Sequence, residues 1–330
     1  MKKTRTTKGL AECAVAAAML ASASAYAVTI DTVPVGNTGN SDDWHGASYG
    51  AVDYGYRIGA YEITAGQYTE FLNAVADTDT YNLYNTEMDV ENSVYGCNIK
   101  RTGSSGSYEY SVVEEWRDRP VNKVSWGDAA RFANWLHNGQ PTGAQGDATT
   151  EDGAYDLNGA TNAADLAAVT RKTGAKWFIP SEDEWYKAAY HKNDGDTGNY
   201  YNYATSTDTQ PGYVNDGGDL SGTGDAFVEG GVDPGNYATY DGDGGINGIG
   251  SPYYQTEVGE WENSASPYGT FDQSGNTFEW TEQVVLSDHI VYRGGNRNND
   301  HTYMKADYRN ISHDGTYEAT SVSFRVATIP

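Results

Sequence analysis

The stretch RPVNKVSWGDA, residues 119–129, decides how the chain folds locally. Ser125 stands three residues before Asp128, the spacing at which two side chains cap each other's backbone N–H at the start of a helix. Beyond Asp128, apolar residues recur at helical spacing until Gly139, a residue typical of helix ends. These apolar positions are Ala129, Phe132, Ala133 and Leu136. The stretch therefore predicts a helix after Ser125 with one buried face.

Two further helices and two short strands are predicted on either side of this stretch. Thr64 precedes an apolar stripe formed by Tyr68, Phe71, Leu72 and Val75. The run PSEDE, residues 180–184, opens a third helix that continues through Trp185. Residues 108–112 and 176–179 are typical of strands.

The composition excludes several classes of partner. The 330 residues carry 46 acidic and 21 basic side chains, a net charge of −25. Such a negative field repels phosphate backbones and anionic lipids, so nucleic acid is not expected as a partner. Residues 193–267 lack periodicity, which indicates either disorder or loops ordered by ligands and metal, and their many tyrosines favour ordered loops.

Residues 1–27 are predicted to be a secretory signal peptide. Lys2, Lys3, Arg5 and Lys8 precede a short apolar run, and residues 25–27 read as an A-x-A cleavage site. A short membrane anchor is the alternative, although the run is too short to span a bilayer comfortably. Removing four positive charges and one negative charge changes the net charge from −25 to −28. We expect residues 28–50 to lead into one domain over residues 51–330, in a secreted or surface-exposed chain without membrane insertion.

The mature chain would keep a single cysteine. Cys13 lies in the signal peptide, so Cys97 has no intramolecular partner. Cys97 is then either a buried small residue or a free thiol available for pairing between chains.

Six ordered motifs carry a resemblance to a known family. They are YEITAGQY (61–68), RPVNKVSW with the following DA (119–129), IPSEDEW (179–185), GNTFEW (275–280), RGG (293–295) and FRVA (324–327). Together they resemble the formylglycine-generating enzyme, or sulfatase-modifying factor, family. The resemblance implies an α+β, irregular, loop-rich C-type-lectin-like fold with few short helices and strands.

The family's catalytic residues are not matched. Its oxidases bind copper(I) through two cysteines after the RGG motif, and the matching positions here are Asn299 and Met304. Soft thiolates suit copper(I), whereas amides do not. We therefore expect no copper and no catalytic residue, with an oxidase of altered metal ligands as the alternative.

The resemblance also implies structural calcium. It assigns the side chains of Asp272 and Glu279 and the carbonyls of Gly275 and Thr277 to one site, a hard oxygen set that suits calcium. A second site would use Asn236 and Asp241. The alternative is that Glu279 is only a buried hydrogen-bond acceptor.

The expected ligand surface follows the RGG motif. Its residues are Asn296, Arg297, Asn298, Asn299, His301 and Tyr303. Amide, hydroxyl and aromatic groups suit contacts with a carbohydrate or protein ligand, or with copies of the same chain. The leading hypothesis is a calcium-stabilised binding or assembly module at the cell surface or in the extracellular matrix. A structural subunit of an extracellular fibre or surface layer is a further alternative, and the plainest interpretation of these residues is that they only solvate a loop.

Overall fold

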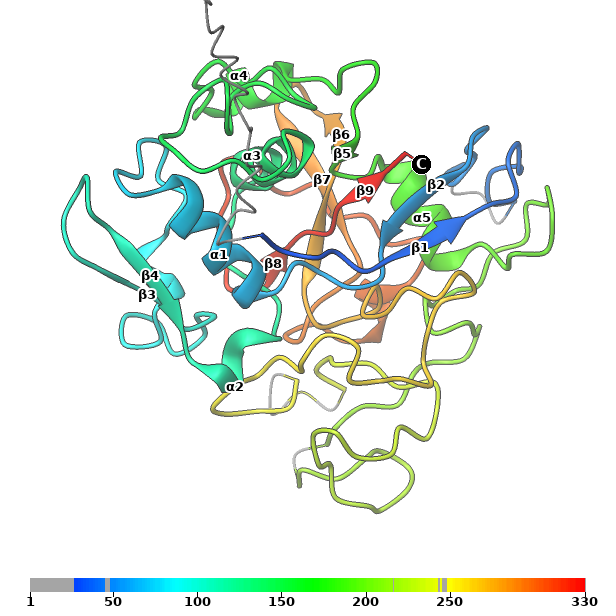
Figure 1. Ribbon diagram of the computed structural model, residues 1–330. Helices are drawn as coiled ribbons and strands as arrows, with labels where there is room; N and C mark the ends of the chain where they lie inside the picture. Colours follow the sequence, from blue (N-terminus) through cyan, green and yellow to red (C-terminus); the bar gives the residue numbers. More distant parts are fainter. Residues whose placement is uncertain (1–26, 45–47, 216, 243, 245–247, 330) are drawn as a thin grey trace, which may run out of the picture.

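The computed structural model describes residues 27–44, 48–215, 217–242, 244 and 248–329 (Figure 1). A four-stranded antiparallel sheet joins both ends of the domain. Its strands are β1 (Thr32–Val35), β2 (Tyr56–Gly59), β9 (Ala327–Thr328) and β5 (Trp177–Phe178), in that order. Since β2 pairs with β1 along one edge and with β9 along the other, the first and last strands close the fold around it.

Two smaller sheets complete the described β-structure. β3 (Ile99–Thr102) and β4 (Glu109–Val112) form a separate hairpin. In the third sheet β6 (Phe278–Val285) pairs antiparallel with β7 (His289–Arg293) and parallel with β8 (Val322–Ser323). The parallel pairing places Val322 opposite Phe278, which brings the chain near residue 320 beside the GNTFEW motif.

The three predicted helices are confirmed. α1 (Ala65–Val75), α3 (Trp126–His137) and α5 (Glu182–Tyr190) each begin with a capping box, led by Thr64, Ser125 and Ser181. The sequence patterns missed the short helices α2 (Glu114–Arg117) and α4 (Ala163–Ala168) and the 3-10 turns η1 (Thr86–Met88) and η2 (His301–Met304). The missed elements have at most six residues, too few to show a helical period.

Aromatic rings from distant segments meet in the core. The Phe132 ring of α3 lies 5.2 Å from Phe71 of α1, 5.6 Å from Trp135 and 5.4 Å from Phe324, measured between ring centroids. Edge-on and tilted contacts of this kind are the favoured arrangements of aromatic pairs. The family motifs around residues 61–68, 119–129 and 324–327 are therefore core-forming segments.

The described parts of the aperiodic stretch are ordered loops held by tyrosines. Tyr240 donates to the carbonyl of Pro211 over 2.6 Å, and Tyr237 donates to the carbonyl of Ser221. Both rings are buried. Residues 210–215 and 217–237 form a lobe, here called the lower lobe, that protrudes beneath the main body in Figure 1.

The expected signal peptide, residues 1–27, lies outside the described residues except for Ala27. Residues 28–50 are tied to the domain, because β1 lies within them and Gln140 contacts Val28 through both its amide oxygen and its amide nitrogen. Among the described residues, none of the helices combines the length and apolar character needed to cross a bilayer.

Cys97 is packed in the core. Its side chain is 1% exposed, and burial raises the pKa of its thiol to about 11. The interpretation of Cys97 as a buried small residue therefore agrees with the structure, since a protonated, enclosed thiol is poorly placed for exchange with another chain.

Candidate functional site

A pocket of about 250 Å³ opens beside the third sheet, and we call it the Asn–Tyr pocket. Phe278 of β6, Tyr292 of β7 and Val322 of β8 supply its strand wall, and the loops after β7 supply the remainder. Its lining residues are Phe278, Tyr292, Asn296, Asn298, Asn299, Tyr303, Asn310, Ser312, His313, Tyr317, Ser321 and Val322. The pocket thus unites residues 278–322 around a short sheet.

Glycine at the end of β7 sets the direction of the amide-rich loop. Gly295 has φ +73°, and a Cβ added there would lie 2.7 Å from Cγ of Met304. The turn places Asn296 so that its Oδ1 accepts from the backbone N–H of Asn298 over 2.7 Å, while its carbonyl accepts from Asn299. Hydrogen bonds within the loop therefore fix its conformation without the help of a ligand.

A stack of rings forms the opposite wall. The rings of His313 and Tyr317 are nearly parallel, with an interplanar angle of 8° and 3.6 Å between centroids. The ring of Tyr292 lies 6.2 Å from that of His313. Burial lowers the pKa of His313 and raises that of Tyr292, so both side chains are neutral at pH 7.

The pocket lining carries no Asp, Glu, Lys or Arg among its residues. Amides, hydroxyls, an imidazole and tyrosine rings remain, a set that donates and accepts hydrogen bonds without a formal charge. The buried Oδ1 of Asn299 has no hydrogen-bond partner within the described part of the chain. An unpaired buried acceptor is unfavourable unless a ligand or water satisfies it.

The structure brings four of the six expected ligand-surface residues into this pocket: Asn296, Asn298, Asn299 and Tyr303. Arg297 instead turns inward, where Nη1 donates to the carbonyl of Thr320 over 2.6 Å, and burial lowers the pKa of its guanidinium to about 10. His301 pairs with the hydroxyl of Tyr203 at 2.8 Å.

Sequence reasoning missed the far wall, which comes from Asn310, Ser312, His313, Tyr317 and Ser321. Their amide, hydroxyl and aromatic composition matches that of the residues after RGG, but the pairing of β8 with β6 and the bridges from β7 to Asn310 and Asp314 are needed to place them opposite that loop. The composition of residues 308–321 could therefore have suggested a binding surface, but the sequence does not show which strands pair and so does not place these residues in the pocket.

The two positions that match the family's copper-binding cysteines face different surroundings. Asn299 lines the pocket. Met304 is fully buried and packs with Tyr203, Ala238 and Tyr240 in a separate apolar cluster. The thioether of Met304 therefore serves as core packing.

The expected first calcium site contains more charge than the sequence indicated. Both carboxylate oxygens of Glu279 accept from Arg325, at 2.5 and 2.6 Å, and Oε2 also accepts from the indole of Trp185. Thr277 donates through its hydroxyl to Oε1 of Glu62 over 3.2 Å. Sequence reasoning missed Glu62 and Arg325, which reach this turn from the other family motifs.

Asp272 and Glu62 share this buried environment. Oδ2 of Asp272 accepts from the backbone N–H of Gly259 over 2.7 Å, and Oε2 of Glu62 has no hydrogen-bond partner among the described residues. Burial, followed by neighbouring carboxylates, raises the pKa of Glu62 well above its usual range. Burial is also the main cause that raises the pKa of Asp272 to about 6. Three carboxylates therefore face a single guanidinium.

The residues fit a hard cation only with backbone help. In the described part of the chain, no group of three or more His, Cys, Asp or Glu residues is arranged to hold a metal ion. Glu279 already accepts three hydrogen bonds, from Arg325 and Trp185, so Asp272 and Glu62 are the carboxylates with more room to serve, together with the carbonyls of Gly275 and Thr277. The oxygen-only donor set and the unpaired Oε2 of Glu62 suit calcium.

The residues of the expected second calcium site have different partners. Oδ1 of Asn236 accepts from the hydroxyl of Thr205 over 2.7 Å. The backbone N–H of Asp241 donates to the carbonyl of Asn299 over 3.0 Å, so Asp241 lies next to the pocket loop without lining the pocket.

Several known proteins are similar to this chain. Treponema denticola variable protein 1 has a TM-score of 0.51 and 18% identity, over 92% of this chain and 96% of that chain. PvdO from Pseudomonas aeruginosa has a TM-score of 0.46 and 15% identity, over 91% of this chain and 92% of that chain. The comparison with curated proteins found no match.

The similarity to Treponema denticola variable protein 1 concerns the fold alone, because the identity is low. The family model described as the sulfatase-modifying factor enzyme 1-like domain matches residues 32–329. The α+β, loop-rich, C-type-lectin-like fold expected from the six motifs is thereby confirmed. The chain belongs to the sulfatase-modifying factor enzyme 1-like domain family.

Proposed function

We propose that the protein is an exported, non-catalytic binding module that holds an uncharged carbohydrate in the Asn–Tyr pocket. The observation that carries the proposal is the absence of formally charged side chains among the pocket's lining residues, in a chain with net charge −25. The pocket has one imidazole, that of His313, which stacks on the ring of Tyr317, and no carboxylate or thiol lines the pocket to work with it in acid–base or metal chemistry. Neutral amides and hydroxyls can instead donate hydrogen bonds to the hydroxyl groups of a sugar and accept hydrogen bonds from them.

The shape of the pocket supports the same ligand class. The rings of His313 and Tyr317 offer an apolar surface, and Asn298, Asn299 and Asn310 offer hydrogen-bonding groups around it. Pyranose rings combine apolar faces with a hydroxyl rim, so they satisfy both parts together. An uncharged protein segment would satisfy the amides but would make less use of the ring stack.

Calcium belongs to the proposal as a structural component. When ionised, the carboxylates of Glu62, Asp272 and Glu279 outnumber the guanidinium of Arg325 that lies near them. A calcium ion held by Asp272, Glu62 and the carbonyls of Gly275 and Thr277 would supply the missing positive charge beside the pocket's strand β6. The ion has no catalytic part in this proposal.

Export completes the proposal. The pattern of residues 1–27 is that of a secretory signal peptide, and a carbohydrate-binding module with one buried cysteine suits the cell surface or the extracellular matrix. N-terminal sequencing of secreted material should begin at Val28.

The test is binding of purified residues 28–330 to an array of neutral and acidic glycans. We expect binding to neutral glycans, with a loss of at least tenfold in affinity for Asn298→Ala and Tyr317→Ala measured by calorimetry. Asn202→Ala is the matched control, because Asn202 is exposed and lies outside the pocket. Binding restricted to acidic glycans, or equal binding by the pocket variants and the control, would overturn the proposal.

A further inference from the structure

A second, larger pocket lies in the lower lobe, away from the Asn–Tyr pocket. It has a volume of about 450 Å³. Leu220, Phe227 and Trp261 form apolar walls, with the rings of Phe227 and Trp261 5.5 Å apart between centroids. Leu220 and Trp261 also belong to the lobe's own buried cluster with Val214 and Tyr237. The walls of this pocket are therefore part of a packed core.

Two valines stand exposed at the rim of this pocket. Val228 is 66% exposed and Val232 is 84% exposed. They flank a tight turn in which the backbone N–H of Gly231 donates to the carbonyl of Val228 over 2.8 Å. Exposed apolar side chains that flank an apolar pocket typify surfaces that a partner covers.

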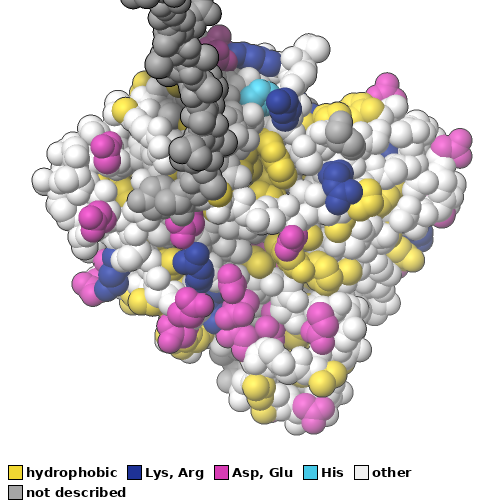
Figure 2. All heavy atoms as spheres, in the orientation of Figure 1, with side chains coloured by type: hydrophobic (Ala, Val, Ile, Leu, Met, Phe, Trp, Pro, Cys, Tyr) yellow, Lys and Arg dark blue, Asp and Glu magenta, His cyan; other side chains and the backbone are white. Residues whose placement is uncertain are grey.

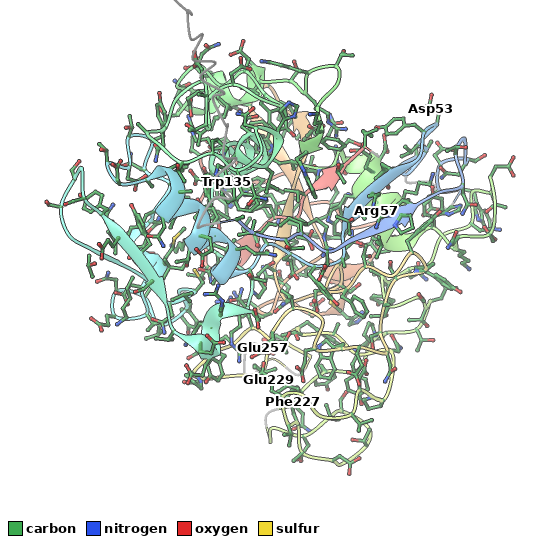
Figure 3. The ribbon with its side chains drawn as sticks, viewed as in Figure 1. Asp53, Arg57, Trp135, Phe227, Glu229 and Glu257 are labelled. Carbon is green, nitrogen blue, oxygen red and sulfur yellow. The ribbon has the colours of Figure 1, made fainter. Side chains whose placement is uncertain are left out.

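Carboxylates surround the same pocket. Asp225 and Glu260 line it, and the side chain of Asp225 makes no hydrogen bond or ion pair within the described residues. Burial, together with the charges of Glu229, Glu257 and Glu262, raises the pKa of Glu260 to about 7. Figure 3 shows Phe227 and Glu229 in the lower lobe with Glu257 next to them, and Figure 2 shows acidic side chains gathered between α2 and this lobe. The acidic residues of the pocket lining itself are Asp225, Asp233 and Glu260, whereas the neighbouring Glu229 forms an ion pair with Arg119 at 2.6 Å.

We propose that this lower-lobe pocket docks a segment of a partner protein that presents a Lys or Arg flanked by apolar side chains. The apolar walls and the two valines would take the flanking side chains, and Asp225 and Glu260 would pair with the cation. A second copy of this chain does not fit, because two surfaces of a molecule with net charge −25 repel each other. Anionic lipid surfaces are repelled for the same reason.

The test uses three fluorescein-labelled decapeptides in 150 mM salt, read by fluorescence anisotropy. One alternates Leu with Lys, one alternates Leu with Glu, and one alternates Ser with Lys. We expect only the Leu–Lys peptide to bind. The double variant Val228→Ser with Val232→Ser should weaken its binding about tenfold, and Glu260→Gln about fivefold, the size typical of interface residues that matter.

Val94→Ser and Leu286→Ser are matched controls, since Val94 is 60% and Leu286 is 66% exposed and neither lines the lower-lobe pocket. Both should bind the Leu–Lys peptide as the unmodified protein does, and hydrogen exchange should slow in residues 220–234 on binding. Equal binding of the Leu–Glu or Ser–Lys peptide, no binding of any peptide, or equal weakening by the controls would overturn the proposal. Glycan binding by the lower-lobe variants should be unchanged, which separates this result from the test of the Asn–Tyr pocket.

Discussion

At the residue scale, Arg325 joins the family motifs through charge. Its guanidinium is fully buried, donates to both oxygens of Glu279, and also donates to the carbonyls of Gly59 and Phe271. One side chain therefore ties β2, the turn before β6 and the C-terminal segment together. The FRVA motif is thus explained by an ion pair that links three distant parts of the chain.

We predict that Arg325→Met destabilises the protein by about 3–5 kcal/mol, because Glu279 would remain buried without its partner. Urea unfolding followed by fluorescence measures the change. Lys100→Met is the control, since Lys100 pairs with Glu91 at the surface, where water and salt screen the attraction and the loss should be much smaller. Equal losses for the two variants would show that the buried pair has no special weight.

We also predict that calcium changes how stability depends on pH. Without calcium, the folded-state pKa values of Glu62 and Asp272 lie above their unfolded values, that of Asp272 at about 6. The folded protein then binds protons that the unfolded chain has released, so this contribution to stability is present at low pH and is lost as the pH rises from about 4 through about 6.

Calcium would hold both carboxylates ionised and remove this loss, so the melting temperature at pH 7 should rise with calcium and fall with chelator. Bound calcium at a hundredfold excess over its Kd adds about 2.7 kcal/mol. Asp272→Asn should abolish the response to calcium, whereas Asp208→Asn, at an exposed position, should preserve it. Identical melting curves with calcium and with chelator would contradict this prediction.

At the element scale, the turn from β7 into the Asn-rich loop is the segment on which the pocket depends. We predict that Gly295→Ala destabilises the protein by about 2–4 kcal/mol, because its positive φ costs about 1–2 kcal/mol for a residue with Cβ and the contact with Met304 adds overpacking. Gly39→Ala separates the two effects, since Gly39 has φ +79° and no atom lies within 4 Å of an added Cβ. Thermal unfolding should show a smaller loss of stability for Gly39→Ala than for Gly295→Ala. Equal losses of stability would show that contact with Met304 does not contribute.

The sequence predicted the helices more readily than the site. Ser125 and Asp128, or Thr64 and Gln67, stand three residues apart, so a capping box and its helix are local and readable. The far wall of the pocket depends on pairings between distant segments, of Phe278 with Val322 and of Tyr292 with Asn310, which no local pattern encodes. For the same reason Glu62 was missed beside Thr277, although both lie in quoted motifs.

At the scale of the whole molecule, charge is distributed unevenly between the two pockets. The Asn–Tyr pocket is lined without a formal charge, while the lower-lobe pocket is edged by Asp225 and Glu260. The net charge of −25 therefore acts mainly through the surface, where it favours solubility and cationic partners. Such a separation is compatible with one face that binds a neutral ligand and another that docks a basic partner.

The same arrangement leads to the prediction about redox activity. Asn299 lines the pocket, whereas Met304 is buried with Tyr203, Ala238 and Tyr240, so the two positions that match the family's cysteines present no thiolate and do not share one open site. Since copper(I) prefers soft ligands and since rate depends on placing the reacting groups together, turnover should fail at both steps. The purified protein, given copper and reductant, should convert no cysteine to formylglycine in a sulfatase-motif peptide, as measured by mass spectrometry.

The double variant Asn299→Cys with Met304→Cys should bind copper weakly and should also show no turnover, because the loop after Gly295 would have to carry the second new thiol out of the core. Copper-dependent conversion by the unmodified protein would overturn the non-catalytic proposal and favour an oxidase with altered metal ligands.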